Sequence, residues 1–382
     1  MREKVEAELD RLVQKGTFDL VDYANWAAPI AAVLKSDRKS VRVCGDFRMT
    51  VNPVSKLHCY PIPRVEDLLA TLSKGKAFSK LDLTQAYQQL KPDAHSQKFV
   101  VINTHKGLFR FTRLPFSISS TPGIFQKTME TLLRGIPGVS VFIDDILISR
   151  ETQAEHLESL EEVLMRLASV GLRVKRSKCK FLVPSIEFLG HLIDGVGIHP
   201  LPDKIQAIQQ APTPTNLTEL KLCIGLLSYY GKFLPHLSTC LAPLYRLLRK
   251  DVTWQWTSEQ EAAFRKSKEL LISSPLLVHY NPDLPLILAC DVSDYGLGAV
   301  LAHRMPDGSE KPIAYVSRTL NPTERNYSQI EREGLSCVFG VKRFYTYLFG
   351  RGFTLVTGHK PLLSLLSGQR PTSAQASARI WR

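Results

Sequence analysis

The chain has 382 residues, and its 44% hydrophobic and 22% charged content is that of an ordinary globular protein with room for two or three domains. Lys and Arg number 49 against 36 Asp and Glu, and the net charge of +13 favours a polyanionic partner, nucleic acid before a membrane surface. No apolar stretch reaches the roughly 18 residues of a membrane span, and the charged N-terminus is not a signal peptide. Seven cysteines without a C-x-x-C pair indicate reduced thiols in the cytosol or nucleus, not a zinc module.

A helix and two strands are expected first along the chain. Residues 1–15 have an amphipathic pattern that predicts a helix ending at Gly16. Its apolar face contains Val5, Leu9, Leu12 and Val13. Strand-like segments follow at 26–30 and 41–48, with a polar turn between them at 35–39.

Two arginines of the second strand-like segment have the spacing of one strand face. Arg42 and Arg48 would point the same way, and guanidinium groups placed like this can bind phosphates. Surface arginines on a β-hairpin need no ligand, so this pattern alone leaves both interpretations open. A proline-stiffened sequence then leads into a helix expected at 64–72.

The segment VSVFIDDILIS, residues 139–149, places two adjacent carboxylates between apolar runs rich in β-branched residues. This pattern predicts a buried β-hairpin with Asp144 and Asp145 at its turn. Asp is common in turns, but like charges in an apolar setting destabilise the fold unless a cation is present. Asp82 ends another short alternating run, so three carboxylates at neighbouring strand ends could hold two divalent ions for phosphoryl transfer on a nucleic acid.

The middle of the chain mixes helices and strands. A helix is expected at 121–133, and a Thr152/Glu155 capping box begins another that ends near Gly171. The apolar stripe of that second helix contains Leu157, Leu160, Leu164 and Leu167. The segments expected next are strands at 174–180 and 186–193, a proline-punctuated linker at about 200–215, a basic helical region at 217–250 and a helix at 258–271.

From about residue 284 the pattern is again rich in strands. The segment 286–291 predicts a strand ending in Asp291, and a second capping box, Ser328 with Glu331, begins a helix that carries Glu333. The remaining elements expected here are strands at 296–301, 312–317 and 353–357 and a helix after Pro361.

Taken together, the chain resembles the Pol polyprotein of a gypsy-class long-terminal-repeat retrotransposon, over its reverse transcriptase and most of a ribonuclease H domain. Any single motif is weak, but thirteen in the right order are specific. They are WAAPI, RVCGDFRMTVNP, YPIPRVEDLLATL, KLDLTQAYQQL, RFTRLPF, FQKTM, FIDDILIS, KCKFL, EFLGHLID, LTELKLCIGLLSYYGKF, ACDVSDYGLGAVL, YVSRTLNPTERNYSQIEREGL and HKPL.

The resemblance implies a multidomain fold of the α+β and α/β classes. Residues 1–195 would form the fingers and palm of a right-hand polymerase, and residues 196–256 a helical thumb and connecting region. Residues 257–382 would form an RNase H-like α/β domain, which we expect to be truncated at its C-terminus.

The resemblance also implies roles for individual residues. Asp82, Asp144 and Asp145 match the catalytic triad that binds two Mg²⁺, with Mn²⁺ as a substitute, and the carbonyl of Leu83 would add a ligand. Lys178 falls where related enzymes place a general acid for pyrophosphate. The other implied roles are Arg42 on the incoming triphosphate, Tyr87 as the gate against a ribose 2′-hydroxyl, Phe116 and Gln126 lining the template and nucleotide side, and Leu189 and Gly190 as the primer grip.

The chain departs from the family pattern at several polymerase positions. Phe142 replaces the usual Tyr and keeps its aromatic packing, so we expect modest harm. Ser117 stands where the family has Gly, and Gly can supply a backbone conformation or a close approach that a side chain blocks. The family also usually has small residues where residues 118–121 lie.

The RNase H half departs further. Asp291 and Glu333 match its first two catalytic, metal-binding carboxylates, but Gly358 stands where the family has the Asp of T-D-H-K-P. A fourth carboxylate would lie beyond Arg382. Two carboxylates would leave the metal ions under-coordinated, so we expect little or no RNA cleavage.

Three hypotheses follow. The first is a reverse transcriptase whose partners are an RNA template, a DNA primer, RNA–DNA hybrid and deoxynucleoside triphosphates. The second is a decayed or domesticated retroelement fragment that binds nucleic acid without catalysis. The third is that the chain is a ribonuclease H by family membership. The expected fold supports this classification better than the incomplete set of catalytic carboxylates does.

Overall fold

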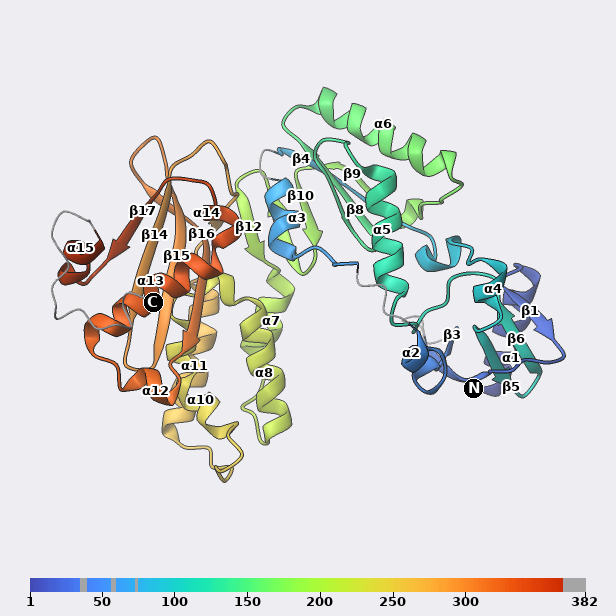
Figure 1. The fold of residues 1–382 in the computed structure, drawn as a ribbon, viewed down its shortest axis with the longest axis horizontal. Helices are drawn as coiled ribbons and strands as arrows, with labels where there is room; N and C mark the ends of the chain where they lie inside the picture. The colour runs from blue at the N-terminus through green and yellow to red at the C-terminus, as the bar shows by residue number, and fades with distance from the viewer. Residues whose placement is uncertain (35–39, 56–59, 73–74, 367–382) are drawn as a thin grey trace. The chain divides into compact units, whose positions relative to one another are not determined.

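The computed structural model describes residues 1–34, 40–55, 60–72 and 75–366, so the turn predicted at 35–39 lies outside the described residues. The chain forms two compact units, residues 1–186 and 187–382 (Figure 1). No helix in the described ranges is long and apolar enough to cross a membrane.

The first unit begins with a five-stranded sheet that is covered by the N-terminal helix. The strands, in sheet order, are β1 (Phe18–Val21), β6 (Gly107–Phe111), β5 (Val101–Thr104), β2 (Ala28–Leu34) and β3 (Val41–Gly45). The predicted helix is α1 (Arg2–Gln14), which buries Val5, Leu9 and Leu12. Val13 is 39% exposed instead, because it lies beside the buried stripe of the helix and not on it.

Short helices connect this sheet to the next. They are η1 (Phe47–Met49), α2 (Val51–Val54), α3 (Val65–Thr71), η2 (Ala86–Gln89) and α4 (Ala94–Gln97). The expectation that Arg48 shares a strand face with Arg42 is wrong, because β3 ends at Gly45 and Arg48 lies in η1. Its guanidinium donates to the Asp46 carboxylate, at 2.9 and 2.7 Å.

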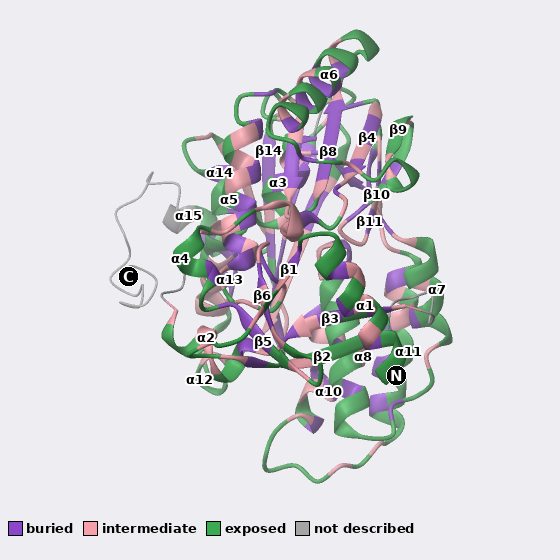
Figure 2. Ribbon diagram, turned by 90° about the vertical axis from the view of Figure 1, so that its right-hand side faces the viewer, coloured by how far each residue is buried: buried purple, intermediate pink, exposed green. Residues whose placement is uncertain are grey.

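The second sheet of this unit contains the predicted carboxylate hairpin. Its strands, in order, are β7 (Val139–Phe142), β8 (Asp145–Arg150), β4 (Ala77–Asp82) and β9 (Lys180–Val183). Helices α5 (Thr121–Leu133) and α6 (Gln153–Ser169) lie beside it, and strand β8 is largely buried, whereas β9 is largely exposed (Figure 2). The short helix η3 (Arg176–Lys178) precedes β9.

Helix α6 begins at the predicted capping box, in which Thr152 and Glu155 each bond the other's backbone N–H. Its predicted stripe is only half right. Leu160 and Leu167 are buried, whereas Leu157 is 46% and Leu164 36% exposed. The buried stripe is turned by one position and contains His156, Ser159, Leu160, Val163 and Leu167.

The second unit starts with a small sheet and a set of helices. The strands, in order, are β10 (Ser185–Phe188), β11 (His191–Asp194), β12 (Gly197–Pro200) and β13 (Leu277–Val278). The helices are α7 (Pro202–Gln210), α8 (Leu217–Tyr229), η4 (Gly231–Phe233), α9 (Leu237–Cys240), α10 (Ala242–Leu247) and α11 (Ser258–Ile272).

The rest of this unit is a four-stranded sheet with helices. The strands, in order, are β16 (Glu310–Thr319), β15 (Gly296–Arg304), β14 (Leu286–Val292) and β17 (Phe353–Thr357). β14 pairs with β17 in parallel, and the other pairs are antiparallel. The helices are α12 (Pro322–Arg325), α13 (Gln329–Arg343), α14 (Tyr345–Leu348) and α15 (Lys360–Leu366). Helix α13 begins at the predicted Ser328/Glu331 capping box and packs on the sheet core around Leu288 and Leu301.

Candidate active site

Strand pairing brings two of the three predicted carboxylates to the same point of the sheet. β4 and β8 are antiparallel, and their register places Asp82 directly opposite Asp145. Asp144 lies in the two-residue turn before β8, and its carbonyl accepts a hydrogen bond from the N–H of Leu83 at 3.4 Å. The hairpin prediction is therefore confirmed, with the turn at residues 143–144 and Asp145 already in the strand.

The hairpin turn is strained, and a buried amide holds it. Ile143 has φ +54°, a left-handed conformation that a β-branched residue rarely adopts. The Oε1 of Gln126 accepts the N–H of Ile143 at 2.6 Å, and the Nε2 of the same amide donates to the carbonyl of Val141 at 2.8 Å. Gln126 is fully buried, and both of these hydrogen bonds are to the backbone of the hairpin. It supports the turn that carries Asp144.

Two lysines neutralise the strand-end carboxylates. The Nζ of Lys178 lies 3.0 Å from Oδ2 of Asp82, and the Nζ of Lys80 lies 2.8 Å from Oδ2 of Asp145. Among the described residues, Asp144 forms no such ion pair. Desolvation raises the pKa of the Asp144 carboxyl, and the negative charges of Asp145 and Asp82 raise it further, although the Lys178 charge acts to lower it. The three carboxylates thus form one electrostatically coupled group.

Three of the residues predicted to bind the nucleotide lie together. The guanidinium of Arg42 lies over the Phe116 ring, 5.2 Å from its centroid, and the rings of Phe116 and Tyr87 have centroids 5.4 Å apart. Tyr87 also packs edge-on against buried Phe125, at 5.3 Å. Burial, and then the Asp144 charge, raises the pKa of the Tyr87 hydroxyl, so this ring links the aromatic group to the carboxylates.

The departure at Ser117 has the structural consequence predicted for it. Ser117 has φ +72°, in the left-handed region that favours glycine. The Asn52 side chain holds this loop, because its Nδ2 donates to the carbonyl of Ser117 and its Oδ1 accepts the N–H of Ser119, both at 3.0 Å. The loop therefore keeps its shape with a residue that the backbone conformation disfavours.

The donor set of the triad suits a hard divalent cation. Carboxylate oxygens at neighbouring strand ends are the ligands that Mg²⁺ and Mn²⁺ prefer. Among the described residues, no three His, Cys, Asp or Glu side chains are already arranged to hold a metal ion. In this structure Lys178 and Lys80 each form an ion pair with a carboxylate oxygen of the triad.

The predicted RNase H carboxylates lie on neighbouring elements of the second unit. Asp291 is near the end of β14, and Glu333 lies in the first turns of α13. The Glu333 carboxylate is buried, with Oε1 accepting from Gln329 at 3.1 Å and Oε2 without a partner among the described residues. Burial, and then the Asp291 charge, raises the pKa of Glu333.

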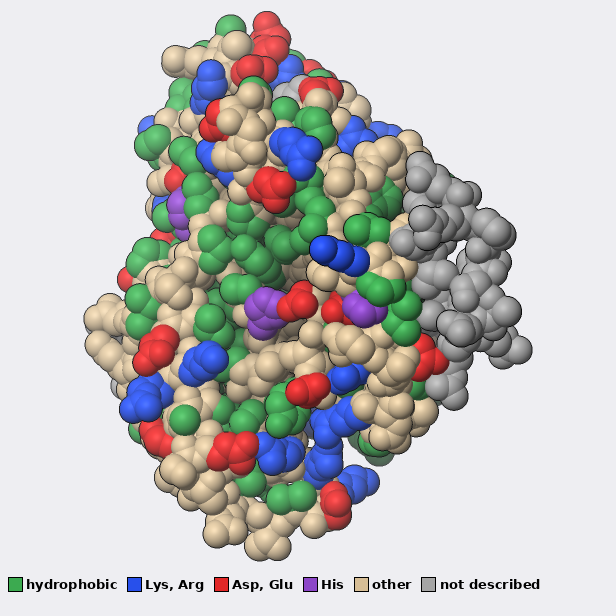
Figure 3. Space-filling view, turned by 90° about the vertical axis from the view of Figure 1, so that its left-hand side faces the viewer, with side chains coloured by type: hydrophobic (Ala, Val, Ile, Leu, Met, Phe, Trp, Pro, Cys, Tyr) green, Lys and Arg blue, Asp and Glu red, His purple; other side chains and the backbone are tan. Residues whose placement is uncertain are grey.

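The missing third carboxylate leaves open space. Cys290 pairs with Thr357, so Asp291 and Gly358 are the next residues on two adjacent parallel strands. A Cβ added at Gly358 would have no atom within 4 Å. His236 approaches Asp291 instead, with its Nδ1 4.0 Å from Oδ2. Figure 3 shows histidine and acidic side chains side by side near the middle of the face that it draws.

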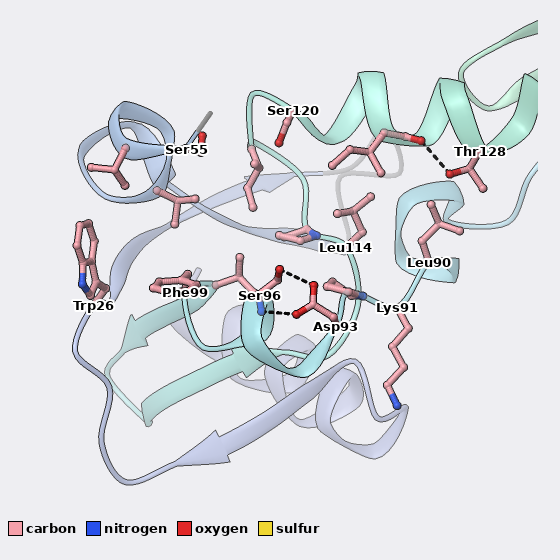
Figure 4. A pocket seen from close by; sticks show the side chains of 17 residues that line it. Trp26, Ser55, Leu90, Lys91, Asp93, Ser96, Phe99, Leu114, Ser120 and Thr128 are labelled. Atoms are coloured by element: carbon pink, nitrogen blue, oxygen red, sulfur yellow. Dashed lines mark hydrogen bonds between the residues drawn. The ribbon is translucent and has the colours of Figure 1, made fainter. Parts of the chain in front are cut away.

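A cavity of about 640 Å³ lies elsewhere in the first unit. It is lined mainly by apolar side chains, including Trp26, Leu90, Phe99 and Leu114, with Lys91 at its edge (Figure 4). The three carboxylates of the hairpin do not line this cavity. The predicted catalytic carboxylates and this cavity are therefore separate features of the first unit.

The predicted primer-grip residues form a tight turn in the second unit. Leu189 and Gly190 connect β10 to β11, and both have positive φ, +44° and +69°. Sequence reasoning missed the residues that support this turn, Tyr229 and Tyr230, and it also missed the support that Gln126 gives to the hairpin. The available signal for the two tyrosines was that they follow an apolar helical run, Leu226 and Leu227, whereas Gln126 is followed by polar residues and gave no such signal.

The comparisons with known proteins agree with this arrangement. Residues 33–193 match the family model described as reverse transcriptase (RNA-dependent DNA polymerase), and residues 256–355 match the RNase H-like domain found in reverse transcriptase. The chain is 34% identical to the retrovirus-related Pol polyproteins from transposons 297 and opus of Drosophila melanogaster, matching 91% and 100% of this chain. It is 30% identical to the transposon Tf2-3 polyprotein of Schizosaccharomyces pombe, over 92% of this chain.

These matches cover only part of each relative. The chain spans 32%, 39% and 27% of the three polyproteins, or about a third of their length. Among solved structures, it is similar to a foamy viral protease-reverse transcriptase in complex with dsDNA, with TM-score 0.88 and 25% identity over 100% of this chain and 79% of that one. A complex of the foamy viral protein with RNA/DNA hybrid gives TM-score 0.82 and 25% identity, over 100% and 51%.

The predicted resemblance to gypsy-class elements and the predicted fold class are thereby confirmed. The chain is similar over most of its length to retrotransposon Pol polyproteins, and it carries a match to a reverse transcriptase domain followed by a match to an RNase H-like domain.

Proposed function

We propose that this chain is an RNA-directed DNA polymerase. The supporting observation is the register that sets Asp82 opposite Asp145, with Asp144 in the adjoining turn. Three acidic side chains at one strand end, with coupled charges, are suited to two-cation phosphoryl transfer. Residues 1–195 would supply the fingers and palm, residues 196–256 the thumb and connection, and residues 257–382 the RNase H-like domain.

Divalent cations are part of this proposal. Asp82, Asp144 and Asp145 would hold two Mg²⁺, or Mn²⁺ in their place, with a further oxygen from the Leu83 carbonyl. Bound there, the ions would favour ionisation of the primer 3′-hydroxyl and neutralise the triphosphate. Lys178 and Lys80 would then leave the carboxylate oxygens that they occupy in this structure. Lys178 would be free to protonate the pyrophosphate, as a general acid.

The aromatic group beside the carboxylates would select the nucleotide. Arg42 is exposed and can reach a triphosphate, while its stacking on Phe116 restricts its conformations. Tyr87, fixed by Phe116 and Phe125, would exclude a ribose 2′-hydroxyl by its bulk. The substrates are then deoxynucleoside triphosphates, on an RNA template with a DNA primer. The related foamy viral protein has been solved in complex with dsDNA and with RNA/DNA hybrid.

The test of this proposal is primer extension on poly-rA with an oligo-dT primer and Mg²⁺. The wild type is compared with the double variant Asp144→Asn, Asp145→Asn, and with Asp251→Asn as a matched control at an exposed acid in a turn. We expect extension by the wild type and the control and none by the double variant. If no protein extends the primer but all bind the hybrid in a salt-sensitive way, the chain is a polymerase in fold only, as in the second hypothesis.

We also propose that the RNase H-like domain cleaves RNA in RNA–DNA hybrids poorly. Asp291 and Glu333 are in place, but Gly358 provides no third carboxylate. Loss of one metal ligand removes several kcal/mol of charge stabilisation, and we expect a rate at least ~10²-fold below that of a complete site.

The Gly358→Asp variant tests this second proposal, because a side chain at this position meets no neighbouring atom. Hybrid cleavage should rise in Gly358→Asp and stay at background in Gly358→Asn, which has the same size without the charge. Equal cleavage by the two variants would show that the defect lies elsewhere.

The compartment proposed for the chain is the cytosol or the nucleus. The six cysteines that the structure describes, Cys44, Cys179, Cys223, Cys240, Cys290 and Cys337, are free thiols, and such compartments keep thiols reduced.

A further inference from the structure

The turn between β10 and β11 adopts a conformation that its sequence does not favour by itself. Leu189 has φ +44° and Gly190 has φ +69°, so both residues of this two-residue connection are left-handed. The left-handed conformation costs a residue with a Cβ roughly 1–2 kcal/mol. Gly190 has no such penalty, but Leu189 has. Contacts outside the turn must therefore hold Leu189 in place.

Those contacts come from two consecutive tyrosines at the end of α8. The Tyr229 hydroxyl donates to the carbonyl of Leu189 at 2.5 Å, and the Tyr230 hydroxyl donates to the carbonyl of Gly190 at 3.0 Å. The two rings are perpendicular, with centroids 5.1 Å apart. The two neighbouring tyrosines thus bond the carbonyls of two neighbouring turn residues. Tyr230 is 2% exposed, and a buried hydroxyl without a partner is costly, so this bond fixes the ring and the turn together.

Gly190 also lies close to the Tyr229 side chain. A Cβ added there would lie 2.7 Å from the Tyr229 hydroxyl oxygen, which is closer than a Cβ ever packs. The turn and the tyrosine are therefore complementary in shape as well as in hydrogen bonding.

His191 completes the cluster. Its ring is stacked with those of Tyr229 and Phe233, with centroid distances of 5.5 and 5.8 Å, and its Nδ1 lies 2.6 Å from the Leu189 carbonyl. Burial, and then the Lys232 charge, lowers the pKa of His191 to about 3. The ring is therefore neutral at physiological pH, and its Nδ1–H can serve as a second donor to the Leu189 carbonyl.

We infer that Tyr229 and Tyr230 are positioning residues, which lock the Leu189–Gly190 turn to helix α8 so that the turn and the helix hold the primer strand as one body. This inference rests on the proposed polymerase function, in which that turn grips the primer. Neither hydroxyl touches a reacting atom. Their effect would be on the placement of the primer 3′ end, where an error of about 1 Å can cost ~10²-fold in rate.

The variants that test the lock are Tyr229→Phe, Tyr230→Phe and their double, with Tyr245→Phe in α10 as a matched control. Phe keeps the ring contacts with His191 and removes only the hydroxyl, so the fold is retained. The loss of one hydrogen bond of about 1 kcal/mol corresponds to roughly 5-fold. Thermal unfolding of each variant measures how much of the protein remains folded at the assay temperature.

The first measurement is single-nucleotide extension with dTTP on the poly-rA and oligo-dT substrate. We expect kcat to fall about 5-fold in each single variant while KM for dTTP stays within about 2-fold, because the nucleotide group is untouched. The double variant should lose less than the product of the single losses, since both hydroxyls hold the same turn. A variant that lowers kcat only in proportion to lost folded protein would overturn the inference.

The second measurement is hydrogen exchange of the amides of residues 188–191 in the free protein, which does not depend on activity. Exchange there should accelerate about 5-fold or more in Tyr229→Phe and Tyr230→Phe and stay at the wild-type rate in Tyr245→Phe. If the wild type extends no primer but exchange accelerates, the polymerase proposal fails and the lock stands as a structural device. If the wild type extends primers but the tyrosine variants match the control in both measurements, the lock is wrong and the polymerase proposal stands.

Discussion

The amide oxygen of Gln126 accepts a hydrogen bond of 2.6 Å from the backbone N–H of Ile143, the left-handed residue next to Asp144. Because Gln126 also donates to the Val141 carbonyl, one buried side chain bonds the turn and the strand before it. The position of the acidic turn thus depends on a helix residue that touches no substrate. The same logic, a strained turn held from a neighbouring helix, recurs at Leu189 in the second unit.

Replacing Gln126 by Met should uncouple the turn. The side-chain volume is nearly kept, but the Ile143 N–H and the Val141 carbonyl lose their partners, at about 1–3 kcal/mol for each buried group. Denaturant unfolding should show this loss, and primer extension should fall further than the lost folded fraction explains. Lys127→Ala, on the exposed face of the same helix, is the control and should stay within about 0.5 kcal/mol. Wild-type stability in Gln126→Met would contradict the role of the amide.

Ser117→Gly should relieve strain in the loop before α5. Ser117 has φ +72°, and Gly accepts that conformation at no steric cost, although it gains entropy in the unfolded chain. The net effect should be an increase in the free energy of unfolding, from a few tenths to about 1 kcal/mol. Ser119→Gly, two residues on with an ordinary φ, should be destabilising instead. Two shifts of the same sign would show that the backbone conformation is not the cause.

Lys178→Ala tests the proposed general acid. The Lys178 side chain is exposed, and its Nζ lies 3.0 Å from Oδ2 of Asp82, at the proposed site of chemistry. Loss of general acid catalysis typically costs ~10²-fold or more, so kcat for extension should fall by about that factor while binding of the hybrid changes little. Lys180→Ala removes the same charge from the adjacent strand and serves as the comparison. Equal losses in the two variants would indicate a general effect of positive charge.

Glu333→Gln gives a prediction for the pH dependence of stability. Burial, and then Asp291, raises the pKa of Glu333 in the folded chain. A carboxyl with a raised pKa contributes stability that is fully present below its unfolded pKa, at about pH 4.3, and is lost as pH rises through the folded value. Wild-type stability should therefore decline relative to Glu333→Gln between about pH 4 and pH 7. Denaturant unfolding at both values measures the difference, and a difference that does not vary with pH would argue against the shift.

Local patterns predicted the parts of the site that a strand or a helix carries by itself. Alternation and β-branched residues placed Asp82 at the end of β4 and the acidic pair at the hairpin, and the capping box before Glu333 set the start of α13. These features depend on interactions between residues a few positions apart, and such local interactions can be predicted from the sequence of a single chain.

Other features depend on contacts between distant segments, and the sequence did not show them. Gln126 bonds Ile143, 17 residues away, and Tyr229 bonds Leu189, 40 residues away. Periodicity also could not decide which of two adjacent stripes of a helix is buried, so Leu157 and Leu164 were assigned to the core although they are exposed. The strand predicted to reach Arg48 was too long, since Arg48 pairs with Asp46 in η1.

The parallel pairing of β14 with β17 has a consequence for the order of assembly. β14, β15 and β16 follow one another as antiparallel neighbours, whereas β17 pairs with β14 only after the chain has run from residue 292 to residue 353. Closing that long loop costs more chain entropy than forming either hairpin, so the hairpins should form early in folding and β17 should dock late. Gly358 follows β17 directly. The position of the third carboxylate in the RNase H-like site should therefore be the last part of that site to fold.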